Sequence, residues 1–167
     1  MVGVDIVPEA IRDAQKNAEI NGVTNCNYFT GKAEDILHNI LRDIDNKDIV
    51  AIVDPPRAGL HQRALSAIRN TVAIKKLVYI SCDAKNAMKN FVDLCRPPSK
   101  TAKGDWILNQ NLNMFLCLLA GDPFLPMKII PVDLFPQTRG FELVIFFERV
   151  AWGDILNTEI AKRIRWR

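Results

Sequence analysis

The spacing of apolar and polar positions along the chain predicts alternating strands and helices. Short apolar runs predict strands at residues 1–6, 27–30, 49–53 and 77–80. After each strand, apolar residues recur every three or four positions, which predicts helices at 8–20, 34–44, 62–72 and 87–95. The run at 49–53 is continuous and is typical of a strand buried on both faces. A proline at position 8 and an Asn-Gly pair at 21–22 mark the two ends of the first helix.

Strands that alternate with helices four times predict an α/β fold with a parallel, doubly wound sheet. The last part of the pattern differs, because residues 127–135 and 141–149 read as two strands joined by a short loop with proline and glycine. We expect them to form an antiparallel pair at one edge of the sheet. Residues 1–150 are therefore predicted to form one domain. Within it, residues 103–126 interrupt the rhythm as an atypical insert, and residues 151–167 form a C-terminal tail with a basic end.

Composition limits the kinds of partner that we expect for this domain. The chain has 167 residues, 49% of them hydrophobic, and a net charge of +3, which permits a nucleic-acid partner without demanding one. Its four cysteines form no Cys-x-x-Cys pair and neither histidine lies near them, so we expect neither a metal site nor a disulfide framework. This predicts a reducing compartment, the cytosol or the nucleus. We expect no signal peptide and no membrane contact, since no apolar run is long enough to cross a bilayer.

The candidate functional residues lie at the ends of predicted strands. Cys82 follows a buried strand and precedes a helical pattern, which is where a nucleophilic thiolate would be favoured, although a buried structural cysteine fits the same position. Asp5 ends the first strand, where doubly wound folds bind ribose hydroxyls. Asp54 precedes two prolines that stiffen the backbone, and a plain strand-to-loop turn is the alternative there. Glu142 opens the last strand and by itself would pass as an edge charge.

Three motifs give these residues a common context. They are Asp-Pro-Pro-Arg-Ala-Gly at 54–59, Ser-Cys-Asp at 81–83, and Leu-Phe-Pro-Gln-Thr at 134–138 followed by Glu142. In this order the chain resembles the 5-methyluridine RNA methyltransferases over residues 2–100 and 127–150. The resemblance implies a Rossmann-like methyltransferase sheet and transfer of a methyl group from S-adenosylmethionine to C5 of a uridine, with tRNA as the expected RNA.

The resemblance also assigns roles to single residues. It implies that Cys82 is the nucleophile that adds to C6 of the uracil and that Glu142 is the general base. Asp5 and Asp54 would bind the cofactor, and Arg57 would help to position the RNA. The target base would have to leave its stack to reach such a site.

The chain departs from the family pattern in ways that leave alternatives open. Gly140 stands where the family commonly has a histidine, and the strand and Gly-rich loop that the family places before Val2 have no counterpart here. We therefore expect a sheet that lacks its first strand and a chain that alone binds S-adenosylmethionine weakly or not at all. A catalytically silent fragment or interaction module is one alternative. Another is a methyltransferase acting on an amino nitrogen, which shares a strand-end Pro-Pro motif but needs no cysteine.

Overall fold

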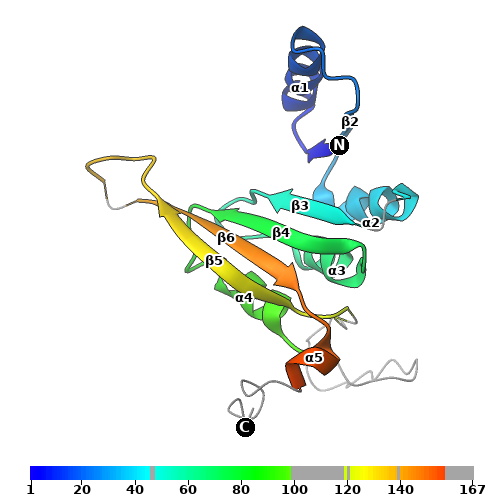
Figure 1. The fold of residues 1–167 in the computed structure, drawn as a ribbon. Coiled ribbons are helices and arrows are strands. Elements are labelled where there is room, and N and C mark those ends of the chain that lie inside the picture. Colours follow the sequence, from blue (N-terminus) through cyan, green and yellow to red (C-terminus); the bar gives the residue numbers. More distant parts are fainter. Residues whose placement is uncertain (46–47, 99–118, 120, 139, 157–167) are drawn as a thin grey trace, which may run out of the picture. The chain divides into compact units, whose positions relative to one another are not determined.

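A computed structural model describes residues 1–45, 48–98, 119, 121–138 and 140–156 (Figure 1). The chain divides into two compact units, Met1–Ile44 and Asp45–Arg167. The predicted extent of one domain over residues 1–150 stays a prediction. Of the predicted insert and tail, residues 103–118, 120 and 157–167 lie outside the described residues.

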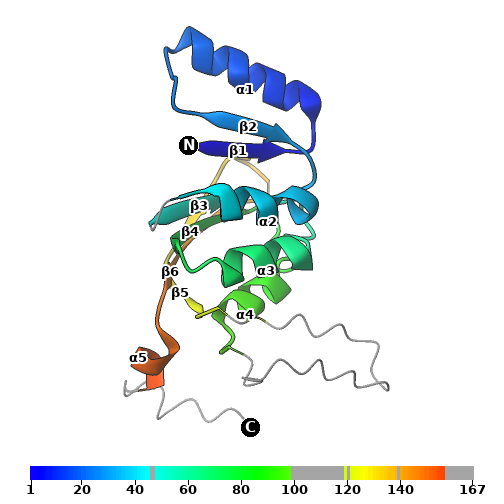
Figure 2. The same ribbon diagram turned by 90° about the vertical axis from the view of Figure 1, so that its right-hand side faces the viewer.

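The first unit is built from two strand–helix repeats. Strand β1 (Val2–Asp5) pairs in parallel with β2 (Asn27–Thr30), and the helices are α1 (Pro8–Ile20) and α2 (Ala33–Asp43). As predicted, α1 begins at the proline, whose missing N–H costs nothing in the first turn. It ends before Gly22, where φ is 65° and Val23 N–H donates to the carbonyl of Ala18 at 2.8 Å. Figure 2 shows α1 lying along the strand pair.

The second unit contains a four-stranded mixed sheet of order β3-β4-β6-β5. Strands β3 (Ile49–Val53) and β4 (Ile74–Ser81) are parallel, whereas β6 (Glu142–Arg149) is antiparallel to both β4 and β5 (Phe124–Val132). The α/β class and the antiparallel pair at one sheet edge are thus confirmed. The bounds of the first strand of that pair were wrong: it spans Phe124–Val132 and not 127–135, because the fully buried Phe124 extends it into the core.

The core of this unit lies between the sheet and two helices, α3 (Gln62–Asn70) and α4 (Met88–Cys95). Figure 2 shows both helices on the same face of the sheet. The Tyr79 ring from β4 meets the Phe91 ring from α4 edge to face at 5.0 Å between centroids. Fully buried side chains come from both layers, namely Leu65, Ile68, Leu77, Leu94, Phe124 and Phe147. A short helix, α5 (Trp152–Leu156), begins the tail.

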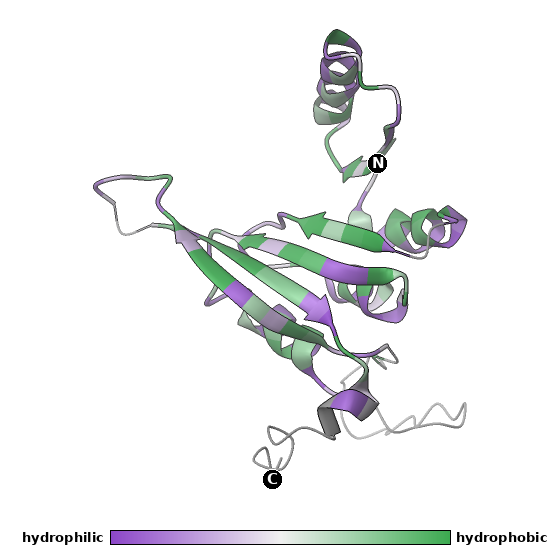
Figure 3. Cartoon of the chain, in the orientation of Figure 1, coloured by the Kyte–Doolittle hydropathy of each residue, from purple (hydrophilic) through white to green (hydrophobic). Residues whose placement is uncertain are grey.

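One prediction about burial was wrong. Strand β3 is not buried on both faces, since Val50 and Ile52 are 60% and 70% exposed. Its other side chains are half-buried, and Figure 3 shows the strand as continuously hydrophobic. A continuous apolar run shows that both faces can be buried, but the helices of this unit cover one face of the sheet.

Two arginines, the buried Arg69 and the half-buried Arg149, donate hydrogen bonds to the C-terminal ends of the helices. Arg69 on α3 donates to the carbonyls of Asp93, Leu94 and Arg96 at 2.7–2.9 Å, at the C-terminal end of α4, and to that of Gly121 at 2.5 Å. Arg149 on β6 does the same for α3, with bonds of 3.0 Å to the carbonyls of Ile68 and Thr71. Burial lowers the pKa of each guanidinium to about 10. These bonds satisfy helix-end carbonyls that would otherwise lack partners.

Candidate active site

Three predicted site residues lie at the same end of the four-stranded sheet. Asp54 follows β3 and Cys82 follows β4, and these strands are parallel, so both residues lie at the carboxyl ends. Strand β6 runs the other way and begins there with Glu142. Figure 1 shows the arrowheads of β3 and β4 at the end of the sheet from which β6 starts. The structure therefore brings together Asp54, Cys82 and Glu142 from three separate parts of the sequence.

The strand register makes Cys82 and Glu142 neighbours. In the antiparallel pairing of β4 with β6, Ser81 stands opposite Leu143. Cys82 is the residue after Ser81 and Glu142 is the residue before Leu143, so one further step of the register sets them opposite each other. Directly opposed residues in an antiparallel pair have side chains on the same face of the sheet. The pairing thus explains how residues sixty positions apart reach one site.

Cys82 is exposed, whereas its neighbour Ser81 is buried. The sequence pattern placed the cysteine at the start of a helix, but α4 begins at Met88 and a turn separates the two. Asp83 holds that turn: its carboxylate accepts from Asn86 N–H at 3.1 Å and from the Asn86 amide at 2.7 Å. The electrostatic influence of a helix N-terminus fades within the first turn, so α4 is too far along the chain to stabilise a Cys82 thiolate in this way. Cys82 is nevertheless accessible to a ligand, because it is exposed.

Glu142 is half-buried, and its Oε2 atom is buried without a hydrogen-bond partner among the described residues. Buried carboxylate oxygens are normally hydrogen-bonded, so an unpartnered one is a feature that needs an explanation. A proton acceptor has to keep a lone pair free, and this oxygen does so.

The segment after β3 forms a fixed turn. Gly59 N–H donates to the carbonyl of Pro56 at 2.8 Å, and Gly59 has φ of 82°, a conformation that favours glycine. Asp54 and Arg57 in this segment are both exposed. The turn is held from α4 by Asn90, which is 5% exposed. Its Oδ1 accepts from Leu60 N–H at 2.6 Å, and its Nδ2 donates to the carbonyl of Leu60 at 3.2 Å.

Sequence reasoning missed Asn90. The available signal was a polar residue on the buried side of α4, three positions after the buried Ala87. A buried asparagine inside a helix needs partners for its amide, and a strand-end loop is a usual source of them.

Asp5 lies in the other unit, at the end of β1. Its carboxylate is exposed, and its Oδ1 accepts from Val7 N–H at 2.7 Å, which fixes the side chain at the strand end. The predicted role of Asp5 in cofactor binding stays a prediction.

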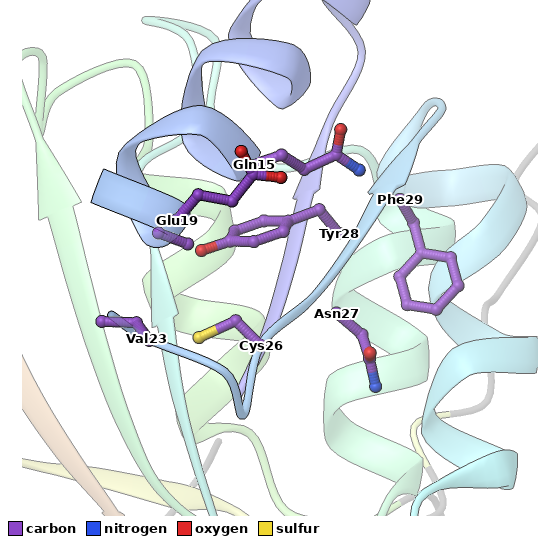
Figure 4. A pocket seen from close by; sticks show the side chains of 8 residues that line it. Gln15, Glu19, Val23, Cys26, Asn27, Tyr28 and Phe29 are labelled. Carbon is purple, nitrogen blue, oxygen red and sulfur yellow. The ribbon is translucent and has the colours of Figure 1, made fainter. Parts of the chain in front are cut away.

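A hollow of about 480 Å³ also lies in the first unit, between α1 and β2. Figure 4 shows the side chains of Glu19, Cys26 and Tyr28 around it. None of the predicted site residues lines it. The candidate site therefore lies at the strand ends of the second unit and not in this hollow.

The described part of the chain has neither of two further kinds of site, a metal site or a membrane-spanning helix. No group of three or more histidine, cysteine, aspartate or glutamate side chains there could hold a metal ion. None of the helices described there has the length and apolar character needed to cross a membrane.

Comparisons with known proteins place this geometry in context. A family model described as tRNA (uracil-5-)-methyltransferase matches residues 1–102. The chain is 42% identical to the human tRNA (uracil-5-)-methyltransferase homolog A over 150 residues, covering 90% of this chain and 21% of that protein. It is 42% identical to the mouse homolog B over 149 residues, which cover 27% of that protein. The chain thus spans about a quarter of the length of these relatives.

A solved structure supports the fold alone. An rRNA methylase from Streptococcus thermophilus superposes with a TM-score of 0.53, covering 89% of this chain and 72% of that one at 13% identity. This likeness shows a Rossmann-like methyltransferase fold.

Proposed function

Since the chain belongs to the tRNA (uracil-5-)-methyltransferase family, we propose that it forms the catalytic part of an enzyme that methylates C5 of a uridine in RNA, with tRNA as the substrate and S-adenosylmethionine as the methyl donor. The observation that carries the proposal is the pairing of β4 with β6, which makes Cys82 and Glu142 neighbours at one sheet end. A nucleophile and a base are the two groups that this reaction requires from a protein.

The reaction begins at Cys82. C5 of uracil is a poor nucleophile, so its reactivity has to be raised before a methyl group can be accepted. The Cys82 thiolate adds to C6, an S–C6 bond forms, and the electron pair of the C5–C6 double bond moves toward C4 and its oxygen as an enolate. C5 of this adduct then carries the electron density needed to take up the methyl group. The exposure of Cys82 leaves its sulfur open to a base that has left its stack.

Glu142 completes the reaction. After C5 has taken the methyl group, it still carries a hydrogen. The Glu142 carboxylate removes this proton, the electrons of the C5–H bond restore the C5–C6 double bond, and the S–C6 bond breaks to release the Cys82 thiolate. The buried Oε2 atom without a hydrogen-bond partner supports this role, because no competing donor occupies it among the described residues.

The chain carries groups that suit part of the methyl donor. The exposed carboxylate of Asp5, fixed by the Val7 N–H, fits ribose hydroxyls at a strand end. The exposed Asp54 at the end of β3 offers further polar contacts, and the exposed Arg57 offers a planar cation for RNA phosphates. When bound, S-adenosylmethionine supplies an electrophilic methyl group on a sulfonium centre.

A second candidate is a silent interaction module of the same family. The exposed Val50 and Ile52 on β3 favour it, because a strand with such side chains on its uncovered face suits a binding surface. This candidate requires no chemistry at Cys82.

The decisive test uses RNA that contains 5-fluorouridine in the presence of saturating S-adenosylmethionine. A base cannot remove fluorine from C5 as it removes a proton, so the last step is blocked. The covalent adduct between the protein and C6 of the base should therefore accumulate and survive denaturing electrophoresis. We expect Cys82→Ala to form no adduct, whereas the half-buried Cys95 serves as the matched control and Cys95→Ala should retain it.

The other outcomes separate the alternatives. Methylation that persists in Cys82→Ala would indicate an amino methyltransferase. No adduct with the unchanged chain would support the silent module.

A further inference from the structure

The buried amide of Asn90 joins three parts of the second unit. From α4, its Oδ1 accepts from Leu60 N–H at 2.6 Å and from the Tyr79 hydroxyl at 2.8 Å, and its Nδ2 donates to the carbonyl of Leu60 at 3.2 Å. Both backbone groups of Leu60 are thereby bound by one side chain. The loop after β3, strand β4 and helix α4 are connected through a single planar group.

The backbone of the loop is shaped to meet this amide. The Pro56–Gly59 turn is closed by a 2.8 Å hydrogen bond, and Gly59 adopts a φ of 82°. A Cβ atom on Gly59 would overlap the Asn90 side-chain oxygen, so the close approach depends on glycine as well. The loop that holds Asp54 and Arg57 is therefore tied down at its far end.

The bonded residues lie close to the candidate nucleophile in sequence and in the sheet. Tyr79 is in β4, the strand that Cys82 follows, and Asn90 is in the helix that follows Cys82. Tyr79 is fully buried, so its hydroxyl is held away from water and bonded to Asn90. A shift of the loop would thus have to break both Leu60–Asn90 hydrogen bonds, while the Tyr79–Asn90 bond holds Asn90 to β4, the strand that Cys82 follows.

We propose that Asn90 is a positioning residue, which fixes the loop of residues 54–60 relative to the strand end that carries Cys82 and so sets the RNA base against the nucleophile. This inference rests on the proposed function. The chemistry of the group explains the residue type. The site needs an acceptor for Leu60 N–H and a donor for the Leu60 carbonyl on the same side chain, and a neutral amide provides both. A carboxylate at this position would lack the donor and would repel the carbonyl.

The test compares Asn90→Ala with Asn39→Ala, an exposed asparagine on α2, in two measurements. Amide hydrogen exchange is followed at Leu60 and at Leu77, a buried residue of β4. We expect exchange at Leu60 to quicken at least about tenfold in Asn90→Ala, as loss of one hydrogen bond implies. Exchange at Leu77 should change far less.

The second measurement is the maximal rate of adduct formation with 5-fluorouridine RNA. It should also fall at least about tenfold, whereas alkylation of Cys82 by iodoacetamide should keep its rate. Asn90→Asp provides a second variant if the alanine variant does not fold. Its rate relative to the unchanged chain should recover as the pH is lowered from about 8 to about 5, because burial at this position raises the pKa of a carboxyl group and the protonated acid regains a donor.

The outcomes distinguish this inference from the function on which it rests. Unchanged exchange at Leu60, equal quickening at Leu60 and Leu77, or an unchanged adduct rate in Asn90→Ala would each overturn the positioning role. The absence of adduct in the unchanged chain would instead overturn the proposed function, and the positioning role with it.

Discussion

Glu142 occupies the first position of β6, and its Oε2 atom is buried without a hydrogen-bond partner among the described residues. The side chain is half-buried, so a charge there is partly shielded from water. If this carboxylate takes the C5 proton, an amide of the same shape should leave the earlier steps intact. Such a variant should stop after methyl transfer, with the methylated base still bound covalently to Cys82.

We expect Glu142→Gln to accumulate a methylated covalent adduct with ordinary uridine RNA and to lose turnover by about 100-fold or more. Single-turnover assays that separate adduct formation from product release would measure this. The matched control is Glu148→Gln, in the same strand and also half-buried, which should turn over normally. Rapid product release in Glu142→Gln would exclude the role of general base.

Tyr79 makes the stability of the protein sensitive to high pH. Burial raises the pKa of its hydroxyl from 10.0 to about 12. Because the folded-state pKa is the higher one, the unfolded chain gives up this proton first. Stability is therefore complete below about pH 10 and falls as the pH rises toward 12.

The change should amount to about 2–3 kcal/mol across that interval. Urea unfolding at a series of pH values would measure it, and Tyr79→Phe should remove this part of the slope. An identical slope in both proteins would show that Tyr79 is not the cause.

Among single residues, Cys82 and Asp54 could be identified as candidates because each follows a predicted strand, whereas Glu142 became a candidate only through the family resemblance. Asn90 escaped notice because its role depends on hydrogen bonds to Leu60, thirty positions away. Such a contact follows from the fold and not from any local pattern. The exposure of Cys82 and the turn that separates it from α4 likewise could not be predicted from periodicity.

Helices α3 and α4 depend on arginine side chains for the carbonyls at their C-terminal ends. Arg69 is fully buried and donates to carbonyls at the end of α4 and to Gly121. Gly121 in turn has no space for a Cβ atom, which would overlap the carbonyl oxygen of Arg69. These two residues thus hold the start of the final strand pair against the helices.

We expect Arg69→Ala to lower the free energy of unfolding by about 3–5 kcal/mol, because it leaves several buried carbonyls without donors. Lys75→Ala, an exposed position on β4 of the same unit, should change it by about 0.5 kcal/mol at most. Equilibrium unfolding in urea would compare the two. Similar stabilities would mean that water replaces the guanidinium at the helix ends.

The elements themselves were largely predictable, because strand and helix periods differ and turn residues separate them. The helix at Pro8 and the antiparallel pair followed from these signals. The true start of β5 at Phe124 did not, since residues 103–126 interrupt the regular rhythm. The exposure of Val50 and Ile52 also could not be predicted, because an apolar run does not show which layers cover it.

At the scale of the whole molecule, both described sheets have edge strands that pair on one side only. Among the described residues, β1 pairs with β2 and β3 pairs with β4, so each has one edge without a strand partner. Asp5 and Asp54 follow these two half-paired strands. Each of these two strands is therefore held by backbone hydrogen bonds along one edge only.

For this reason we expect the 167-residue chain to bind S-adenosylmethionine weakly, so the adduct and turnover assays need the cofactor in large excess. Isothermal titration calorimetry would test this, and heat of binding with micromolar affinity would contradict it. Asp5→Ala is the matched control if binding occurs, since loss of its carboxylate should abolish binding at the first unit.

The bonds of Arg149 have a consequence for how the protein is made. This residue, at the end of β6, donates to the carbonyls of Ile68, Arg69 and Thr71, which were synthesised some eighty positions earlier. Strand β6 also separates β4 from β5 in the sheet. A ribosome must therefore release residues up to 149 before α3 acquires its C-terminal partners and the sheet acquires its interior strand. Until then the emerging chain exposes the edge of β4, and folding of this unit has to wait for β6.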